Sequence, residues 1–280
     1  MLLAIALTVS CNSRDRQSAE KNDDTSTAHR IVTLAPHLSE LVFAAGAGDK
    51  LVGVSAFSDY PPEVSAVPVV SDAFTVDQEQ LAMLQPDMLL AWASGTPAHV
   101  VDELRDAGYN VTSIRTRGID EITRAILEIG ELAGTGDLAG QVARDFDETL
   151  TTISDGYSNM PEISVFYQVS SRPLFTINGE HYISEIIGMC GGRNVFADLG
   201  DLAPGVTVEA VVERNPEVLL AGSADGRLPF EDWRRWEQLA ANRYGNQFIV
   251  SADAIGRPSV RLVDAAEEVC HVLEVARLNR

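Results

Sequence analysis

The sequence predicts an α/β protein with two Rossmann-like lobes, joined by a single long backbone helix and with a ligand cleft between them. Three observations lead to this fold class. Short β-rich runs alternate with amphipathic helical runs from Arg30 onward, which is typical of largely parallel sheets covered by helices. One helix-turn-strand unit recurs 130 residues later, and a long helical segment separates the two copies.

The stretch 30–135 reads as the N-terminal lobe. Strands are expected at 31–34, 51–54, 67–70, 88–92 and 110–114. Helices are expected from Pro36 and Ser39, from an Asp77 cap to Leu84, near 98–107, and from an Asp120 cap. These starts follow from the preference of proline and short polar side chains for the first positions of helices.

The second half repeats part of this plan, which predicts a C-terminal lobe over 160–280. Glu79, Pro86 and the run 89–91 correspond to Glu209, Pro216 and the run 219–221, always 130 residues apart. One such unit is a common local solution, whereas two in register suggest two lobes of one design. A chance likeness between generic units is the alternative.

A connecting helix is expected over 136–159. Apolar residues recur there every three or four positions, at Leu138, Val142, Phe146, Leu150 and Ile153, as on one face of a helix. Such a strut leaves a cleft between the lobes, and ligands of α/β sheets bind beyond the carboxyl ends of the strands. We therefore place the ligand site in that cleft.

The N-terminus predicts export. Residues 1–10 are apolar or small, Cys11 follows, and 12–29 are almost wholly polar, as in a flexible linker. This arrangement resembles a bacterial lipoprotein signal over 1–11, with Cys11 as the lipidated residue. The basic residues usual before such a signal are absent, so an ordinary cleaved signal or a frayed apolar N-terminus is the alternative.

Export of the protein would place its two other cysteines in an oxidising compartment. Cys190 and Cys270 lie in one lobe, and an oxidising compartment favours a disulfide between them over two buried free thiols. The bond would close a loop of 80 residues, which in the chain-entropy model contributes roughly 4 kcal/mol.

Composition excludes several functions. The 280 residues carry a net charge of −20, which repels nucleic-acid phosphates. No apolar run reaches the roughly 18–20 residues of a membrane span.

No catalytic motif or Cys/His metal cluster is visible in the sequence. We therefore expect neither an enzyme nor a resident cofactor, and an exported chelatase-like enzyme is the alternative. Gly191-Gly192 reads as a closely packed helix end rather than a phosphate loop.

Several motifs carry a family resemblance. They are Ser58-Asp59-Tyr60-Pro61-Pro62, Pro86-Asp87 with Ala91-Trp92, the segment 190–196, and Arg257-Pro258-Ser259-Val260-Arg261. With these the chain resembles the periplasmic vitamin B12-binding proteins of ABC importers, in the helical-backbone (class III) solute-binding family. The resemblance implies a Cys190–Cys270 disulfide. It also implies that Glu79 and Glu209 dock onto arginines of a transmembrane permease.

The candidate ligand contacts are Phe57, Tyr60, Phe74, Trp92, Phe175, Asp253 and Arg257. The resemblance implies Phe57, Phe175 and the loop 253–257, whereas Phe74 would replace a ring lost at Ala73, and Trp92 is expected either at the cleft or in the core. A corrin is a flat disc fringed with amides, which aromatic faces and a few polar groups can hold. Ala73, Ala203 and Ala254 stand where the family has tryptophans. A related corrinoid such as cobinamide, or another bulky chelate, therefore stays open.

A ferric siderophore or haem is the alternative cargo, because arginines could line the cleft. The candidates are Arg115, Arg117, Arg172, Arg257 and Arg261. His37, His99 and His181 could reach a bound metal centre, although ordinary surface or core histidines are the simpler interpretation. We expect an exported monomer on a lipid anchor whose partners are a corrinoid and a permease.

Overall fold

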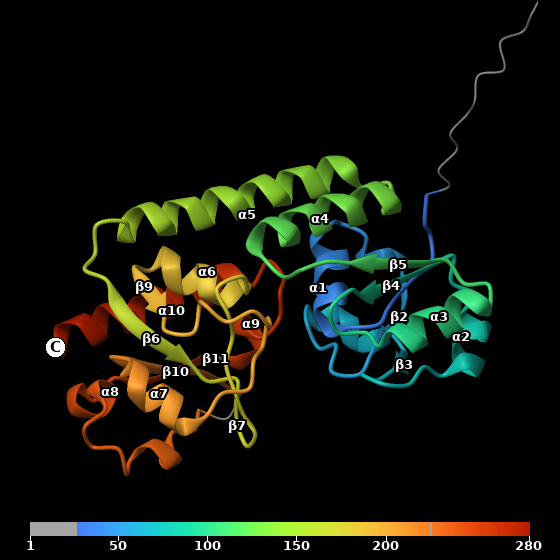
Figure 1. Cartoon of the computed structure of the whole chain (residues 1–280). Coiled ribbons are helices and arrows are strands. Elements are labelled where there is room, and N and C mark those ends of the chain that lie inside the picture. The colour runs from blue at the N-terminus through green and yellow to red at the C-terminus, as the bar shows by residue number, and fades with distance from the viewer. Residues whose placement is uncertain (1–26, 225) are drawn as a thin grey trace, which may run out of the picture.

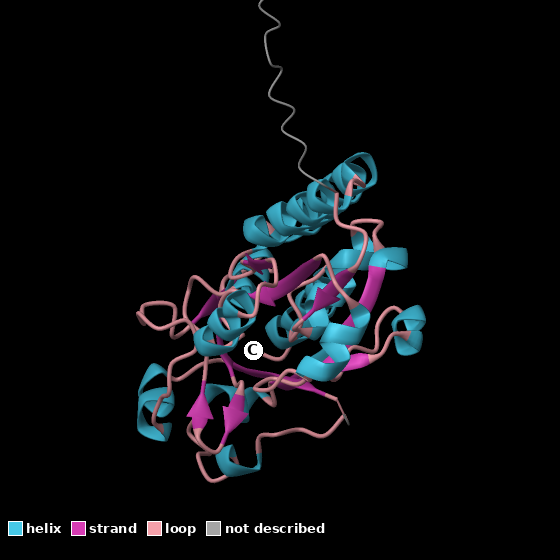
Figure 2. Ribbon diagram, turned by 90° about the vertical axis from the view of Figure 1, so that its right-hand side faces the viewer, coloured by secondary structure: helices cyan, strands magenta, loops and turns pink. Residues whose placement is uncertain are grey.

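The computed structural model describes residues 27–224 and 226–280. They form two α/β lobes with two long helices along one side (Figures 1 and 2). The predicted signal, Cys11 and the linker up to residue 26 lie outside the described residues. Ala28 is buried, and its N–H donates to the carbonyl oxygen of Leu132. The packed lobe therefore begins two residues before Arg30.

The N-terminal lobe is built on a five-stranded parallel sheet of order β3-β2-β1-β4-β5. Its strands are β1 Ile31–Thr33, β2 Leu51–Ser55, β3 Val69–Ser71, β4 Met88–Trp92 and β5 Val111–Ile114. The helices of this half are α1 Pro36–Ala44, α2 Gln78–Leu84, α3 Ala98–Asp106, α4 Ile119–Ala133 and α5 Gly136–Tyr157, with short 3-10 turns at Gly48–Lys50 and Pro62–Ala66. The predicted strand and helix order is confirmed.

The C-terminal lobe is built on a four-stranded parallel sheet of order β11-β10-β6-β9. Its strands are β6 Ile163–Tyr167, β9 Gly192–Asn194, β10 Val218–Ser223 and β11 Gln247–Ser251, and the small antiparallel pair β7 Ser170–Ser171 and β8 Leu174–Phe175 stands apart. The helices are α6 Tyr182–Met189, α7 Val208–Arg214, α8 Ala240–Tyr244, α9 Ala252–Ile255 and α10 Leu262–Leu278, with a 3-10 turn at Glu231–Trp233.

The two sheets share one plan. The order β2-β1-β4-β5 of the first corresponds to β9-β6-β10-β11 of the second, which lacks only the edge strand β3. The repeated unit also matches in its helix ends. The side chains of Asp77 and Thr207 cap α2 and α7, and Gln85 and Asn215 end them with φ of 46° and 44°. The two copies seen in the sequence are thus equivalent in structure.

The predicted long connecting helix is confirmed, and a second helix lies beside it. The long helix is α5, and α4 packs along it (Figure 1). A Cβ at Gly130 of α4 would lie 2.2 Å from that of Ala139 in α5, so the close approach requires a glycine. The helix α5 therefore joins the lobes, since it contacts α6 and α10 of the second lobe, while α4 packs on α1 of the first lobe and along α5.

The start of α4 corrects the predicted Asp120 cap. The N-cap is Gly118, without a side-chain hydrogen bond, and Asp120 lies in the first turn. Its carboxylate is paired with Arg124, 2.7 Å away and one turn later. The N–H of Ile119 is instead satisfied by Glu185 of the second lobe, at 3.2 Å. A contact between lobes has therefore replaced a local cap.

The predicted disulfide is confirmed, and so is the role of the glycines beside it. Cys190 and Cys270 are bonded, and the bond ties the end of α6 to α10. Gly191 has a φ of 69°, and a Cβ on Gly192 would lie 2.7 Å from Ile187. Within the described residues, no helix has both the length and the apolar character needed to cross a bilayer.

Candidate ligand cleft

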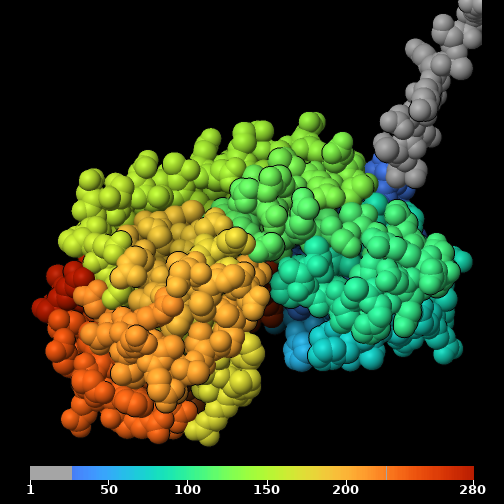
Figure 3. Space-filling model, in the orientation of Figure 1, coloured from blue at the N-terminus to red at the C-terminus, as the bar shows by residue number. Residues whose placement is uncertain are grey.

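The two lobes meet beneath the helix pair and leave a notch on the opposite side (Figure 3). The segments that follow the parallel strands come together here. Glu40 and Asp59, after β1 and β2, contact Arg257, after β11. Sites in doubly wound sheets form beyond the carboxyl ends of the strands. Of the residues predicted to bind ligand, Tyr60, Asp253 and Arg257 take part in contacts at this junction.

The first-lobe wall presents aromatic rings from three strand ends. Phe57 follows β2, Phe74 follows β3 and Trp92 ends β4. Phe57 is 83% exposed and Phe74 74% exposed, and Phe57 also has a φ of 66°. A bulky residue at positive φ is strained. A large exposed ring also lacks the stabilisation that burial of its apolar surface would provide. Both features mark this wall as a candidate binding surface.

A small pocket of about 150 Å³ opens in this wall between Phe57, Ala73 and Trp92. Its remaining lining is mostly apolar, from Leu34, Ala35, Pro36, Ala56, Gly95 and Thr96, with Ser55 and Asp72 as further polar members. Trp92 also packs edge-on against His37, with ring centroids 4.9 Å apart. Ala73 thus leaves room where a larger side chain would close the pocket.

The second-lobe residues are arranged less uniformly. Phe175 lies half-buried on β8, and Asp253 lies exposed on α9. Of the two other alanines that the resemblance placed at tryptophan positions, Ala203 is exposed, whereas Ala254 is buried in the core. A larger side chain at Ala254 would therefore require the second lobe to repack.

Arg257 lies at the junction of the lobes. Its guanidinium donates to Glu40 at 3.0 Å and to Asp59 at 3.2 Å, and it pairs with Asp253 at 3.3 Å. The hydrogen bond to Asp59 is the main cause that raises the pKa of Arg257, and the same bond lowers the pKa of Asp59. Arg261, one turn later, stacks over the ring of Tyr60 at 4.5 Å.

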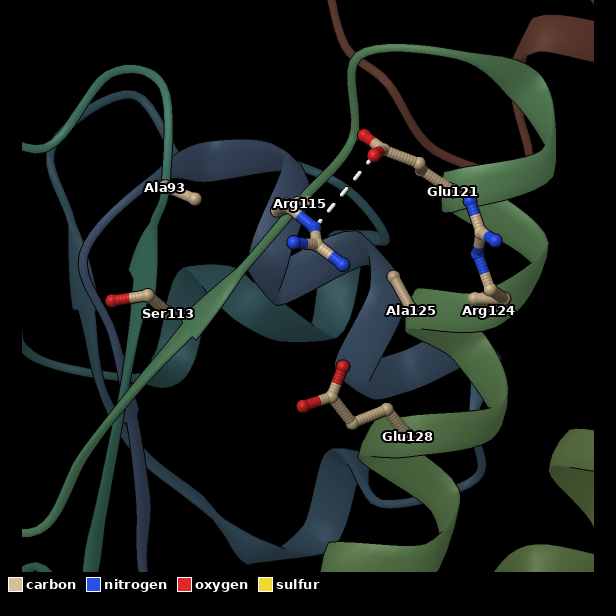
Figure 4. A pocket seen from close by; sticks show the side chains of 7 residues that line it. All are labelled: Ala93, Ser113, Arg115, Glu121, Arg124, Ala125 and Glu128. Carbon is tan, nitrogen blue, oxygen red and sulfur yellow. Dashed lines mark ion pairs between the residues drawn. The ribbon is translucent and has the colours of Figure 1, made fainter.

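Each of the arginines considered for an anionic cargo is paired with a carboxylate. The pairs are Arg115–Glu121 at 3.7 Å, Arg117–Glu180 at 2.6 Å, Arg172–Asp232 at 2.9 Å, Arg257–Glu40 at 3.0 Å and Arg261–Glu40 at 3.4 Å. Figure 4 shows the hollow of about 440 Å³ beside Arg115, which two arginines and two glutamates line. Only Arg257 and Arg261 are paired with a buried carboxylate, and the other three pairs are exposed to solvent.

The three histidines have different surroundings. His99 is exposed, and the ring of His181 accepts the N–H of Ile183 at the start of α6. Burial lowers the pKa of His181 to about 4. His37 is buried, and burial followed by the charge of Arg257 lowers its pKa to about 3. Among the described residues, no three His, Cys, Asp or Glu side chains gather as metal ligands would.

Glu79 and Glu209 occupy equivalent places on the two lobes. Each is exposed in the first turn of its short helix, two residues after the capping residue. Neither forms an ion pair with another side chain of the described chain. Two unpaired carboxylates in symmetric positions are suited to a partner with two-fold symmetry.

Sequence reasoning missed Glu40, and it did not recognise how Asp59 and Ser259 are used. Glu40 stands among apolar residues of α1 and is only 2% exposed. Its neighbours Leu38, Leu41 and Val42 are all buried, so a carboxylate in that run could have been noticed as a charge on a buried face. The partners of Glu40 could not have been identified from the sequence, because they lie more than 200 residues away along the chain.

Comparisons with known proteins agree with this architecture. Residues 31–256 match the family model described as periplasmic binding protein. The vitamin B12-binding protein of Vibrio cholerae serotype O1 is 35% identical over 254 residues, covering 89% of this chain and 91% of that protein. Its counterpart in Vibrio parahaemolyticus is 35% identical over 90% of this chain and 91% of its own length.

A solved structure extends the likeness to three dimensions. The crystal structure of the periplasmic vitamin B12 binding protein of Vibrio cholerae superposes with a TM-score of 0.80. The two chains are 35% identical, and the match covers 89% of this chain and 98% of the other. The two-lobe fold with its connecting helices is therefore shared over nearly the whole described chain.

Proposed function

Because the chain belongs to the periplasmic binding protein family, we propose that it captures a corrinoid, vitamin B12 or a close relative, and delivers it to the permease of an ABC importer. The two Vibrio relatives are named vitamin B12-binding proteins, and the match to this chain covers about nine-tenths of the length of each. In this proposal the protein performs no chemical step. It binds cargo between the lobes 30–135 and 160–280 and releases it at the membrane.

The exposed aromatic wall is the observation that carries the proposal. Phe57 and Phe74 hold large apolar rings in water at the edge of the cleft, and burial against a flat ring system would recover that area. The carboxylates that pair with the cleft arginines favour an uncharged, amide-fringed cargo. An anionic siderophore or haem would have to compete with those carboxylates for each guanidinium.

Titration of the purified protein tests the cargo. We expect cyanocobalamin or cobinamide to bind more tightly than haem or a ferric catecholate siderophore, measured by tryptophan fluorescence or calorimetry. Phe57→Ala should weaken corrinoid binding about tenfold. Met83→Ala is the matched control, since Met83 is also a large exposed apolar residue, at 72%, but lies on α2. Tight haem binding without corrinoid binding would contradict the proposal.

Docking through Glu79 and Glu209 is a separate part of the proposal. Reversal of both charges to lysine should abolish corrinoid uptake by cells while the affinity for corrinoid in solution stays unchanged. Asp145→Lys with Glu148→Lys on the exposed face of α5 is the control with the same charge change. Normal uptake by the Glu79/Glu209 variant would refute this role.

Export and anchoring complete the proposal. We propose that the protein is exported as a monomer and held at the membrane by a lipid on Cys11. Incorporation of labelled palmitate should occur in the natural chain and disappear in Cys11→Ala. Labelling that persists in the variant, or is absent from both proteins, would contradict the anchor without affecting the cargo assignment.

A further inference from the structure

The lobe junction holds a buried carboxylate with partners from the other lobe. Glu40, on α1 of the first lobe, is 2% exposed. Ser259 donates its hydroxyl to Glu40 Oε2 at 2.5 Å, and Arg257 and Arg261 pair with Oε1 at 3.0 and 3.4 Å. All three partners come from one segment, 257–261, between α9 and α10. A single first-lobe carboxylate therefore binds three side chains of one second-lobe segment.

Other contacts extend this cluster to the rim of the cleft. Arg257 also reaches Asp59 and Asp253, and Arg261 covers the ring of Tyr60. Three carboxylates and two guanidinium groups thus share one connected network. Ser259 is fully buried beside Glu40, so water has little access to the centre of the network.

The physical consequence is a strong coupling between the lobes. A buried charge is tolerated only while it is paired and hydrogen-bonded. If the lobes moved apart here, Glu40 and Ser259 would both lose their partners until water entered. A second set of contacts between the lobes joins residues at and just before the starts of α4 and α6. The Tyr182 N–H donates to the Arg117 carbonyl oxygen at 2.8 Å and the Ile119 N–H donates to Glu185 at 3.2 Å, beside the Arg117–Glu180 ion pair. Arg117 and Glu180 are largely exposed, so that ion pair is weak.

We propose that Glu40 is a clamp residue, which fixes the relative position of the two lobes in the ligand-free protein. Through Arg257 and Arg261 it also positions the segment that borders the cleft. The helix α5 joins the lobes on one side of the molecule, and the Glu40 cluster holds them where the strand ends meet. This inference depends on the contacts between lobes and not on the identity of the cargo.

Hydrogen exchange of the ligand-free full chain tests the clamp. Glu40→Gln removes the charge with little change of shape. We expect the amides of Ser259 and Leu262, which donate to carbonyls of the clamped segment, to exchange at least tenfold faster. Protection in β4 should stay unchanged. A role confined to the first lobe would leave the second-lobe segment as protected as before, and that result would overturn the clamp.

Two further variants keep the test decisive. Ser259→Ala removes one hydrogen bond from the second-lobe side and should accelerate exchange in α1 around Glu40, in the same direction but less strongly. It carries the test if Glu40→Gln does not fold, and unchanged exchange in α1 would then overturn the clamp. Glu103→Gln, on the exposed face of α3, is the matched control and should change neither segment. Since no ligand is added, a wrong cargo assignment would not alter these outcomes.

Discussion

Acid should destabilise this protein through His37. The imidazole is only 3% exposed and packs against Trp92. Burial, and next the nearby charge of Arg257, lower its pKa from 6.5 to about 3. The folded protein therefore keeps His37 neutral at pH values where the unfolded chain protonates it.

The size of the effect follows from this difference in pKa. Between pH 6.5 and 3 the unfolded state binds more protons, so the free energy of unfolding falls as the pH falls. One pKa unit corresponds to about 1.4 kcal/mol, and pH 5 lies 1.5 units below the unfolded value. His37 should thus remove about 2 kcal/mol of stability between pH 7 and pH 5.

Urea unfolding followed by circular dichroism at pH 7 and pH 5 measures this loss. His37→Met keeps an apolar side chain of similar length and cannot protonate, so it should lose about 2 kcal/mol less than the natural protein. Burial lowers the pKa of His181 in the same direction, and that contribution remains in both proteins. His99→Gln, at an exposed site, should behave as the natural protein does. Equal losses with and without His37 would refute the reasoning.

Two further predictions concern stability. The Cys190–Cys270 disulfide closes a loop of 80 residues. The Cys190→Ala/Cys270→Ala variant should therefore be less stable by about 4 kcal/mol in urea unfolding. Equal stability of the two proteins would show that the unfolded chain is already constrained. Gly192→Ala places a Cβ 2.7 Å from Ile187 and 2.8 Å from Leu273, which should cost about 1–3 kcal/mol. Gly188→Ala in the same region meets no atom within 4 Å, so it should be neutral or stabilising, and a similar loss in both would contradict the packing argument.

The repeated unit was predictable because its signals are local. Asp77 and Thr207 cap helices through the N–H three residues ahead, and a proline follows each left-handed end residue. Such interactions involve neighbours in sequence, so they can be identified before the fold is known. The long helix α5 was predictable for the same reason, from its apolar periodicity.

Errors occurred where a distant partner replaced a local one. Asp120 has the residue type and position of a cap, yet Glu185 from the other lobe satisfies the nearby N–H of Ile119. The partners of Arg257, which are Glu40 and Asp59 of the first lobe, could likewise not be identified from the sequence, but they do not contradict the predicted ligand contact. Its contact with cargo remains a prediction.

The sequence by itself determined the α/β class, the doubled plan, the long connecting helix and the pairing of the two cysteines as the favoured choice. Periodicity, caps and turns act over a few residues, so their information is present in short segments. The tertiary structure alone decided which charges meet. Electrostatic pairing acts through space. Glu40 acquires its partners only when folding brings residues 257–261 against it. The same proximity decides that Arg257 and Arg261 are paired with Glu40 rather than free.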